Sequence, residues 1–259
     1  MAYDTPAALR ATLEDRLANR SRETGIDLER LRRRAAFERL LVRLELGAPG
    51  RWIVKGGMAL EVRLGDRARS TRDLDLALRD AATEDAAVRD LLIDCLLADP
   101  DSDGFEFRIG NAGQITDDDA GRPGWRFSAE CRLAGRRFAT VRLDVVARAN
   151  EITRTERVSL PGILEFAEIA RHTVEVVDPL QHFAEKIHTL TRSDGDRPNS
   201  RVRDLADIVL LIEDGLAASP ELLRVVAHVF DERNMHPLPH EIADPPRSGA
   251  TATRHWLPT

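Results

Sequence analysis

Apolar residues recur at helical spacing near both ends of the chain and in short strand-like runs between them. Leu9, Leu13 and Leu17 follow Pro6 at four-residue spacing, and proline is favoured in the first turn of a helix. A second apolar stripe of the same period extends over residues 27–46. The N-terminal region is therefore predicted to form two helices that pack on a core.

The middle of the chain changes from helical spacing to short apolar or alternating runs. Residues 58–64 and about 83–96 keep the helical pattern. The segment 111–124 is interpreted as a solvated loop, and 152–177 as irregular with one short strand and one short helix. A short apolar run ends at Lys55, and the predicted strands are 73–78, 105–109, 125–133 and 137–147.

The C-terminal part is predicted to be helical. Asp178 is a favourable N-cap and Pro179 suits the first helical position, so a helix should start there. Further helices are predicted over 201–213 and 219–230, and the tail from Asn234, which has four prolines before residue 247, is expected to be extended. The run Arg32, Arg33 and Arg34, together with His182 and His188, is assigned to the surface, and Ile212 to a buried face.

Composition is that of an ordinary globular protein, with 42% hydrophobic and 32% charged residues. The net charge of −6 argues against a general nucleic-acid coat, although it leaves a local basic groove open. No apolar run has the length of a membrane span, and the N-terminus lacks a signal-peptide pattern. Cys95 and Cys131 both stand in apolar contexts, so we expect free core cysteines in a cytoplasmic protein.

Two aspartates mark the segment around which the chain is organised. Strand alternation over 73–78 places Asp73 and Asp75 on one face and leucines on the other. Two adjacent carboxylates repel each other unless a cation lies between them, and hard divalent cations prefer oxygen ligands. Asp144 lies on the polar face of another apolar strand. It could be an edge charge or a salt-bridge partner, and we interpret it as a third metal ligand.

A second chemical signal precedes the aspartates. Gly56 and Gly57 would let the backbone approach a ligand closely, and the helix behind them offers free N–H groups that suit a phosphate. Lys55 adjoins these glycines, and Lys186 borders the apolar stripe of the helix that starts near residue 178. They are the only two lysines among 38 basic residues, which makes both functional candidates. A phosphate cradle beside a metal-binding carboxylate pair is the layout of a nucleotidyltransferase.

The order of these motifs resembles the AbiEii/AbiGii group, the MenT-like toxins of bacterial toxin–antitoxin pairs. The resemblance extends over roughly residues 35–213. It is carried by Lys55-Gly56-Gly57-Met58-Ala59-Leu60, by Arg69-Ser70-Thr71-Arg72-Asp73-Leu74-Asp75-Leu76, by Lys186, and by Arg203-Asp204-Leu205-Ala206-Asp207.

The resemblance implies an α+β fold of the polymerase-β-like nucleotidyltransferase superfamily, with a small mixed sheet flanked by helices. The expected domains are N-terminal helices over 1–50, the nucleotidyltransferase core over 51–177, a helical subdomain over 178–232 and a tail over 233–259. Met58 departs from the superfamily, in which many members carry serine or threonine, so phosphate binding should depend more on backbone N–H groups and Lys186.

The activity that the resemblance implies is Mg²⁺-dependent transfer of NMP from an NTP to an acceptor. The expected acceptor is the 3′ end of tRNA, and the expected role is the toxin of a toxin–antitoxin system with a cognate antitoxin. Asp73, Asp75 and Asp144 would bind two Mg²⁺ ions, with Lys186 as a further catalytic residue. The nucleotide-binding residues would be Lys55, Gly56, Gly57, Arg72, Lys186, Arg203 and Asp204.

Two other functions remain to be weighed. A catalytically silent nucleotide-binding module, recognised by a protein partner, is disfavoured by the presence of all three carboxylates. A phosphatase of the haloacid-dehalogenase type would use Asp73 as nucleophile. That chemistry usually shows glycine with threonine or valine after the second aspartate, whereas Leu76 and Ala77 follow Asp75 here.

Overall fold

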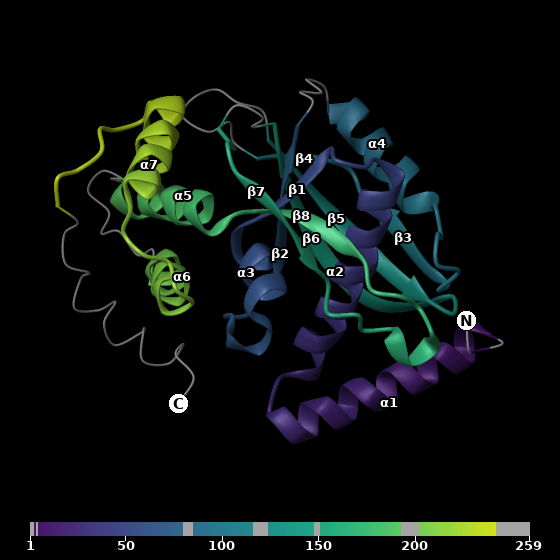
Figure 1. Cartoon of the computed structure of the whole chain (residues 1–259). Helices are drawn as coiled ribbons and strands as arrows, with labels where there is room; N and C mark the ends of the chain where they lie inside the picture. Colours follow the sequence, from purple (N-terminus) through teal and green to yellow (C-terminus); the bar gives the residue numbers. More distant parts are fainter. Residues whose placement is uncertain are drawn as a thin grey trace.

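The computed structural model describes residue 3 and residues 5–79, 85–115, 124–147, 151–192 and 202–241. In this part of the chain, helices surround one mixed β-sheet (Figure 1). The helices are α1 (Pro6–Thr24), α2 (Leu28–Gly47), α3 (Gly56–Leu64), α4 (Asp85–Leu97), α5 (Pro179–Thr191), α6 (Val202–Glu213) and α7 (Pro220–Arg233), with 3₁₀ turns η1 (Gly65–Arg67) and η2 (Glu165–Ala167). The strands are β1 (Trp52–Lys55), β2 (Asp73–Leu78), β3 (Phe105–Ile109), β4 (Gly113–Ile115), β5 (Gly124–Leu133), β6 (Arg136–Val146), β7 (Thr155–Ser159) and β8 (Thr173–Val177).

The sheet joins strands that are far apart in the sequence. Its order is β3-β5-β6-β2-β1-β8-β7, and β4 pairs with β5. The central strand β2 runs antiparallel to β1 and parallel to β6, while β8 runs parallel to β1. The predicted α+β class is confirmed, although the sheet has eight strands and is larger than expected. Strands β4 and β8 lie in segments that the sequence analysis interpreted as loop or irregular.

Local capping explains why the N-terminal helices form where the sequence predicts them. The Thr5 hydroxyl accepts a hydrogen bond from the Ala8 N–H at 3.2 Å, and Pro6 occupies the first turn of α1. The Asp27 carboxylate accepts from the Arg30 N–H at 2.9 Å at the start of α2. The predicted start of α4 near residue 83 lies outside the described residues.

Two main apolar cores hold the chain together. The larger core joins the sheet with buried residues of α1, α2 and α4, and a smaller one is shared by α5, α6 and α7. Figure 1 shows α5, α6 and α7 grouped at one end of the sheet, next to α3. The ends of the central strands therefore face the C-terminal helices, and this junction is where the predicted site residues lie.

Three surface or core assignments were wrong. His182 and His188 are 0% and 1% exposed. Helices α6 and α7 pack against α5, and the His188 ring contacts the Phe230 ring of α7. Ile212 is 53% exposed near the end of α6. The three arginines at 32–34 are all half-buried rather than solvated.

The prediction for the cysteines is confirmed. Cys95 and Cys131 are both buried and free. Among the described helices, none has both the length and the apolar character needed to cross a membrane.

Candidate active site

Strand pairing brings the predicted carboxylates together from two parts of the chain. In the parallel register of β2 and β6, Asp75 lies beside Asp144 and Asp73 lies beside Arg142. Because side chains two residues apart share a face of a strand, Asp73, Asp75 and Asp144 all belong to the same face of the sheet. The opposite face carries Leu74 and Leu143, both fully buried.

Two arginines neutralise the outer carboxylates. Arg126 on β5 donates two hydrogen bonds to Asp144, from Nε at 2.8 Å and from Nη2 at 2.6 Å. Arg142 forms an ion pair with Asp73. With these pairs in place, no group of three or more His, Cys, Asp or Glu side chains in the described ranges is arranged to hold a metal ion. Asp144 is thus a salt-bridge partner in this structure, one of the roles considered above.

Asp75, between them, has an unusual protonation equilibrium. Burial is the main cause that raises its pKa, and the Lys186 ammonium opposes it. The neighbouring carboxylates of Asp144 and Asp73 raise the pKa further, and the result is a value of about 6. Asp75 is therefore the carboxylate of this site that is short of positive charge.

Gly56 and Gly57 each closely approach another residue of the site, in addition to any role in binding phosphate. Gly56 starts α3 directly after β1 with a φ of +57°, and a Cβ at this position would lie 1.9 Å from Asp75 Oδ2. A side chain there would overlap the carboxylate, so only glycine fits both the backbone angle and the contact. A Cβ on Gly57 would come within 3.0 Å of the Thr71 side chain. The close approach that Gly56 permits is thus to Asp75 itself.

Lys186 belongs to a buried ion cluster that links α5, α6 and the loop before β2. Its Nζ lies 2.8 Å from both Asp204 Oδ1 and Asp207 Oδ2. Arg69 donates to the same Asp207 carboxylate from Nε at 2.6 Å and from Nη2 at 2.7 Å. Burial lowers the pKa of Lys186, but the two aspartates outweigh it and the net pKa is raised.

Two members of this cluster, Arg69 and Asp207, were not among the predicted site residues. Both lie inside the motifs quoted above, so the signal was present in the sequence. Asp207 is 0% exposed and is three residues from Asp204 on α6, which lets one helix face present both carboxylates to Lys186. Sequence spacing could have indicated Asp207, but its pairing with Arg69 depends on how α6 packs.

Lys55 is tied into a second buried cluster. Its Nζ lies 3.0 Å from Glu185 and 3.6 Å from Glu151. Arg233 of α7 also pairs with Glu151, and the Gln181 side-chain amide donates to Glu185 at 3.2 Å. Lys55 therefore connects the end of β1 to helices α5 and α7 as well as facing the site.

The predicted site residues line two cavities that meet at Asp75 and Lys186. The first, here called the Asp144 cavity, has a volume of about 420 Å³. The second, here called the Arg72 cavity, has a volume of about 810 Å³. The Asp144 cavity is lined by Lys55, Gly56, Asp75, Leu76, Asp144, Val146, Glu185, Lys186, His188, Thr189, Arg192, Asp204, Arg233 and Met235. The Arg72 cavity is lined by Thr24, Gly25, Ile26, Asp27, Arg30, Arg33, Gly57, Arg69, Ser70, Thr71, Arg72, Asp73, Asp75, Arg142, Lys186 and Arg203.

All ten predicted site residues thus lie on one or both walls of this double cavity. The carboxylate oxygens of Asp73, Asp75 and Asp144 are donors of the type that Mg²⁺ takes, and the shortage of positive charge at Asp75 suits a cation. Binding at all three carboxylates would require Arg126 and Arg142 to release their partners.

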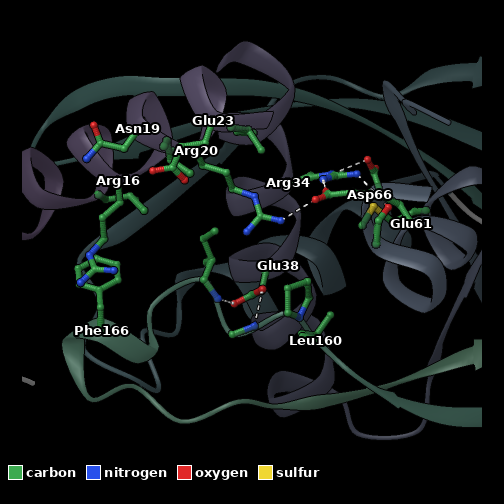
Figure 2. A pocket seen from close by; sticks show the side chains of 18 residues that line it. Arg16, Asn19, Arg20, Glu23, Arg34, Glu38, Glu61, Asp66, Leu160 and Phe166 are labelled. Atoms are coloured by element: carbon green, nitrogen blue, oxygen red, sulfur yellow. Dashed lines mark hydrogen bonds and ion pairs between the residues drawn. The ribbon is translucent and has the colours of Figure 1, made fainter. Parts of the chain in front are cut away.

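A third cavity, of about 560 Å³, contains none of the predicted site residues. It lies among α1, α2, the end of α3 and the 160–166 segment (Figure 2). The Glu38 carboxylate accepts from the backbone N–H groups of Gly162 and Ile163 there, and the Arg16 guanidinium lies over the Phe166 ring. Arg20 pairs with Asp66 there, and Arg34 pairs with Glu61 and Asp66. These contacts join α1, α2 and α3, which is typical of a structural contact between elements.

Several solved structures, including the following three, are similar to the chain. Two are from Helicobacter pylori: JHP933 and a putative nucleotidyltransferase, each 18% identical with a TM-score of 0.44. Their alignments cover 77% of this chain and 72% and 75% of theirs. An antigenic nucleotidyltransferase-like protein from Paracoccidioides brasiliensis is 19% identical, with a TM-score of 0.42, over 77% of this chain and 90% of that one. No curated protein is significantly similar to the chain.

A family model matches a larger part of the chain than do these solved structures. The family described as "Nucleotidyl transferase AbiEii toxin, Type IV TA system" matches residues 39–257, which is more than half of the chain and includes every predicted site residue. This confirms the resemblance drawn from the Gly56-Gly57, Asp73-Leu74-Asp75 and Lys186 motifs. The chain belongs to the AbiEii family of nucleotidyltransferase toxins.

Proposed function

We propose that this nucleotidyltransferase moves NMP from an NTP to the 3′ end of tRNA in a Mg²⁺-dependent reaction, as the toxin of a toxin–antitoxin pair. The observation that carries the two-substrate reaction is the double cavity, whose two halves share Asp75 and Lys186. Nucleotidyl transfer requires a donor and an acceptor to meet at one phosphorus atom. Two cavities that open onto the same carboxylate and the same ammonium provide that geometry.

The triphosphate is assigned to the Arg72 cavity. Gly57 in the first turn of α3 lines it, as do Arg72, Arg203 and Lys186. Backbone N–H groups at a helix start and cationic side chains are the groups that bind phosphates most effectively. The acceptor hydroxyl is assigned to the Asp144 cavity, where Asp144 would accept its proton.

Asp73, Asp75 and Asp144 would hold the metal. When bound, Mg²⁺ neutralises charge on the phosphates and makes the attacking hydroxyl more acidic. Ion pairs with Asp204 and Asp207 fix the position of Lys186. Its ammonium would therefore contact the substrate with little conformational freedom. Gly56 leaves room for Asp75 to adopt the observed position.

The test is incorporation of α-labelled NTPs into total RNA in the presence of Mg²⁺, with each of the four NTPs supplied separately. Wild-type protein should label a tRNA-sized band, and sequencing of the product should place the added nucleotide at the 3′ end. Asp73→Ala should lose incorporation while it keeps the wild-type melting temperature. Asp15→Ala is the matched control, because Asp15 is exposed on α1 and lines neither cavity of the site. Full activity of Asp73→Ala would refute the assignment.

A catalytically silent nucleotide-binding module is the second candidate. It is favoured by one observation, that Asp144 and Asp73 are already paired with Arg126 and Arg142. This candidate predicts nucleotide binding without labelling of any RNA or protein acceptor, under conditions in which the protein is folded.

The biological setting is also proposed. A toxin of this family would act in the cytoplasm, where tRNA and NTPs occur, together with a cognate antitoxin protein. A small reading frame next to this gene whose product restores growth when both are expressed would support that setting. Growth that is unaffected by expression of the chain alone would contradict it.

A further inference from the structure

Three consecutive arginines on α2 have three different environments. Arg32 donates to Glu14 from Nε at 2.9 Å and from Nη2 at 2.8 Å. Arg34 donates from Nε to Glu61 at 2.6 Å and also pairs with Asp66, and Figure 2 shows these contacts beside the third cavity. Arg33, between them, has no ion pair or hydrogen bond to any other described residue, and its Nε is buried without a hydrogen-bond partner.

Arg33 lines the Arg72 cavity, on the same wall as Asp27 and Arg30. Arg30, one turn earlier on α2, lines it too, but Arg30 is committed to Glu61 at 3.1 Å and to the Ala68 carbonyl at 2.7 Å. Arg33 is half-buried, so its guanidinium is partly removed from water without a compensating partner. Its buried Nε–H lacks an acceptor, and a buried polar group without a hydrogen bond is costly, which points to a ligand that supplies an anionic acceptor.

The other cations of this cavity divide into two sets. Lys186, Arg69 and Arg142 are paired with aspartates. Arg72 and Arg203 form no ion pair with any other described residue, as is the case for Arg33. Three guanidinium groups without an ion-pair partner in the described part of the chain therefore line one cavity together with Asp75. They come from α2, from the loop before β2 and from α6.

We propose that Arg33 binds a phosphate of the NTP at the side of the Arg72 cavity formed by α2, so that the N-terminal helices complete the nucleotide site. A guanidinium fork matches two phosphate oxygens and remains charged at all relevant pH values. This inference rests on the proposed assignment of the triphosphate to this cavity. Arg33 precedes the matched residues 39–257, so the contact comes from a segment outside the family match.

A nucleotide polyphosphate fits the observations better than an RNA backbone. The cavity is bounded, with about 810 Å³, and contains Gly57 in the first turn of α3 together with Lys186. These groups, with the three uncommitted arginines, line one compact cavity. An extended RNA backbone would need a series of basic residues along the protein surface. The net charge of −6 argues against such a surface.

The direct test is isothermal titration of the full chain with inorganic tripolyphosphate in Mg²⁺ buffer, because this probe does not depend on the preferred base. Loss of one charge-assisted contact should weaken binding by about tenfold in Arg33→Gln. Arg33→Lys keeps the charge without the fork and should recover part of the affinity. Arg32→Gln is the matched control, since Arg32 is the neighbouring arginine and lies outside the cavity, and it should bind as the wild type does.

Two further measurements, of thermal unfolding and of transfer kinetics, separate a loss of phosphate binding from a loss of folding. Thermal unfolding should show that Arg33→Gln folds, because the substitution breaks no ion pair in the described structure. If that variant fails to fold, Arg33→Lys must still bind tripolyphosphate more weakly than wild type. In the transfer assay, Arg33→Gln should raise the KM for NTP and leave kcat nearly unchanged.

Equal affinity of Arg33→Gln and wild type for tripolyphosphate would overturn the inference. So would a loss confined to binding of a short single-stranded RNA, since Arg33 would then contact the acceptor. A wild-type protein that fails to transfer nucleotides, but whose tripolyphosphate binding still depends on Arg33, would refute the proposed function and leave this inference standing.

Discussion

Asp103 and Asp75 show how the same side chain serves two purposes in one molecule. Burial acts to raise the pKa of both carboxyls. At Asp103 the guanidinium groups of Arg43 and Arg39 outweigh burial, and the pKa is lowered. At Asp75 the lysines do not outweigh burial and the adjacent carboxylates, and the pKa is raised to about 6. The difference arises from the partners and not from burial.

The Asp103 cluster is closed. Asp103 is 0% exposed, it accepts from Arg43 Nη2 at 2.6 Å and from Arg39 Nε at 2.5 Å, and it caps the Phe105 N–H at 2.8 Å. These contacts join α2 to the segment before β3. In such a closed cluster every charge has a partner within the protein. The cluster therefore stabilises the contact between these elements and offers no unpaired charge to a ligand.

The cluster around Asp75 is open. Several cations of the site are committed to other carboxylates: Lys186 to Asp204 and Asp207, Lys55 to Glu185, Arg126 to Asp144 and Arg142 to Asp73. Arg33, Arg72 and Arg203 line the Arg72 cavity without a carboxylate partner among the described residues. Asp75 itself forms no ion pair in the described structure, and it faces both cavities beside the carboxylates of Asp73 and Asp144. Perturbed carboxyls in a cavity are a mark of functional sites, and here the deficit is one that an external cation would fill.

The comparison is tested most strongly by removing the charge of Asp75. Asp75→Asn keeps the shape of the side chain but removes the negative charge. That charge would bind the metal and attract the Lys186 ammonium. We expect nucleotidyl transfer to fall by at least about a thousandfold, as for a central catalytic group. Initial rates of NTP incorporation measure this effect. An activity within tenfold of wild type would place the reaction centre elsewhere.

The second test is the corresponding change at the closed cluster. Asp103→Asn leaves the buried Arg39 and Arg43 with Asp101 and Asp99 as their only carboxylate partners among the described residues, which should lower the free energy of unfolding by about 3 kcal/mol. Urea denaturation followed by circular dichroism measures it. Transfer activity per folded molecule should be unchanged at a temperature where the variant is folded. A stable variant with impaired transfer would mean that the two clusters are coupled.

The smallest effect is the pH dependence of stability at Asp75. Its folded-state pKa of about 6 exceeds the ordinary value of 3.8, so between these values the folded state keeps a proton that the unfolded state has lost. Wild-type stability should therefore fall, relative to Asp75→Asn, as pH rises from about 4 to 6, by at most about 3 kcal/mol, and then stay constant. For Asp103 the pKa is lowered, so its contribution is present at neutral pH and is lost on acidification.

Chemical denaturation of wild type and Asp75→Asn at several pH values between 4 and 8 measures this difference. It should be carried out without divalent cations, because a bound cation would remove the repulsion among the carboxylates. A stability difference that does not change over this range would show that the Asp75 pKa is not raised.

The local parts of the fold could be predicted because their causes are local. Pro6 and the caps at Thr5 and Asp178 fix where helices start, and the period of the apolar residues fixes which face is buried. Alternation along β2 was enough to place Asp73 and Asp75 on the same face. The family motif then identified the chemistry, because its residues are close together in the sequence.

Contacts between distant segments could not be predicted in this way. Nothing in the period of α5 shows that His182 and His188 are covered, since the cover comes from elements elsewhere in the chain. Likewise, Arg32, Arg33 and Arg34 have the same local sequence context, yet two are paired and one faces the Arg72 cavity. Their difference depends on where α1 and α3 lie beside α2.

The sequence by itself determined the helices and most of the strands, the pair Asp73 and Asp75, and membership of a nucleotidyltransferase family, because capping, alternation and motif order are properties of short segments. Only the tertiary structure decided that Asp144 lies beside Asp75, that Arg126 and Arg142 hold the outer carboxylates, and that Arg69 and Asp207 fix Lys186. The parallel pairing of β2 with β6, the antiparallel pairing of β5 with β6 and the packing of α6 set these contacts. The contacts Asp75–Asp144, Asp73–Arg142 and Arg69–Asp207 join residues more than 60 positions apart, and their energy depends on which surfaces meet rather than on the local order of residues.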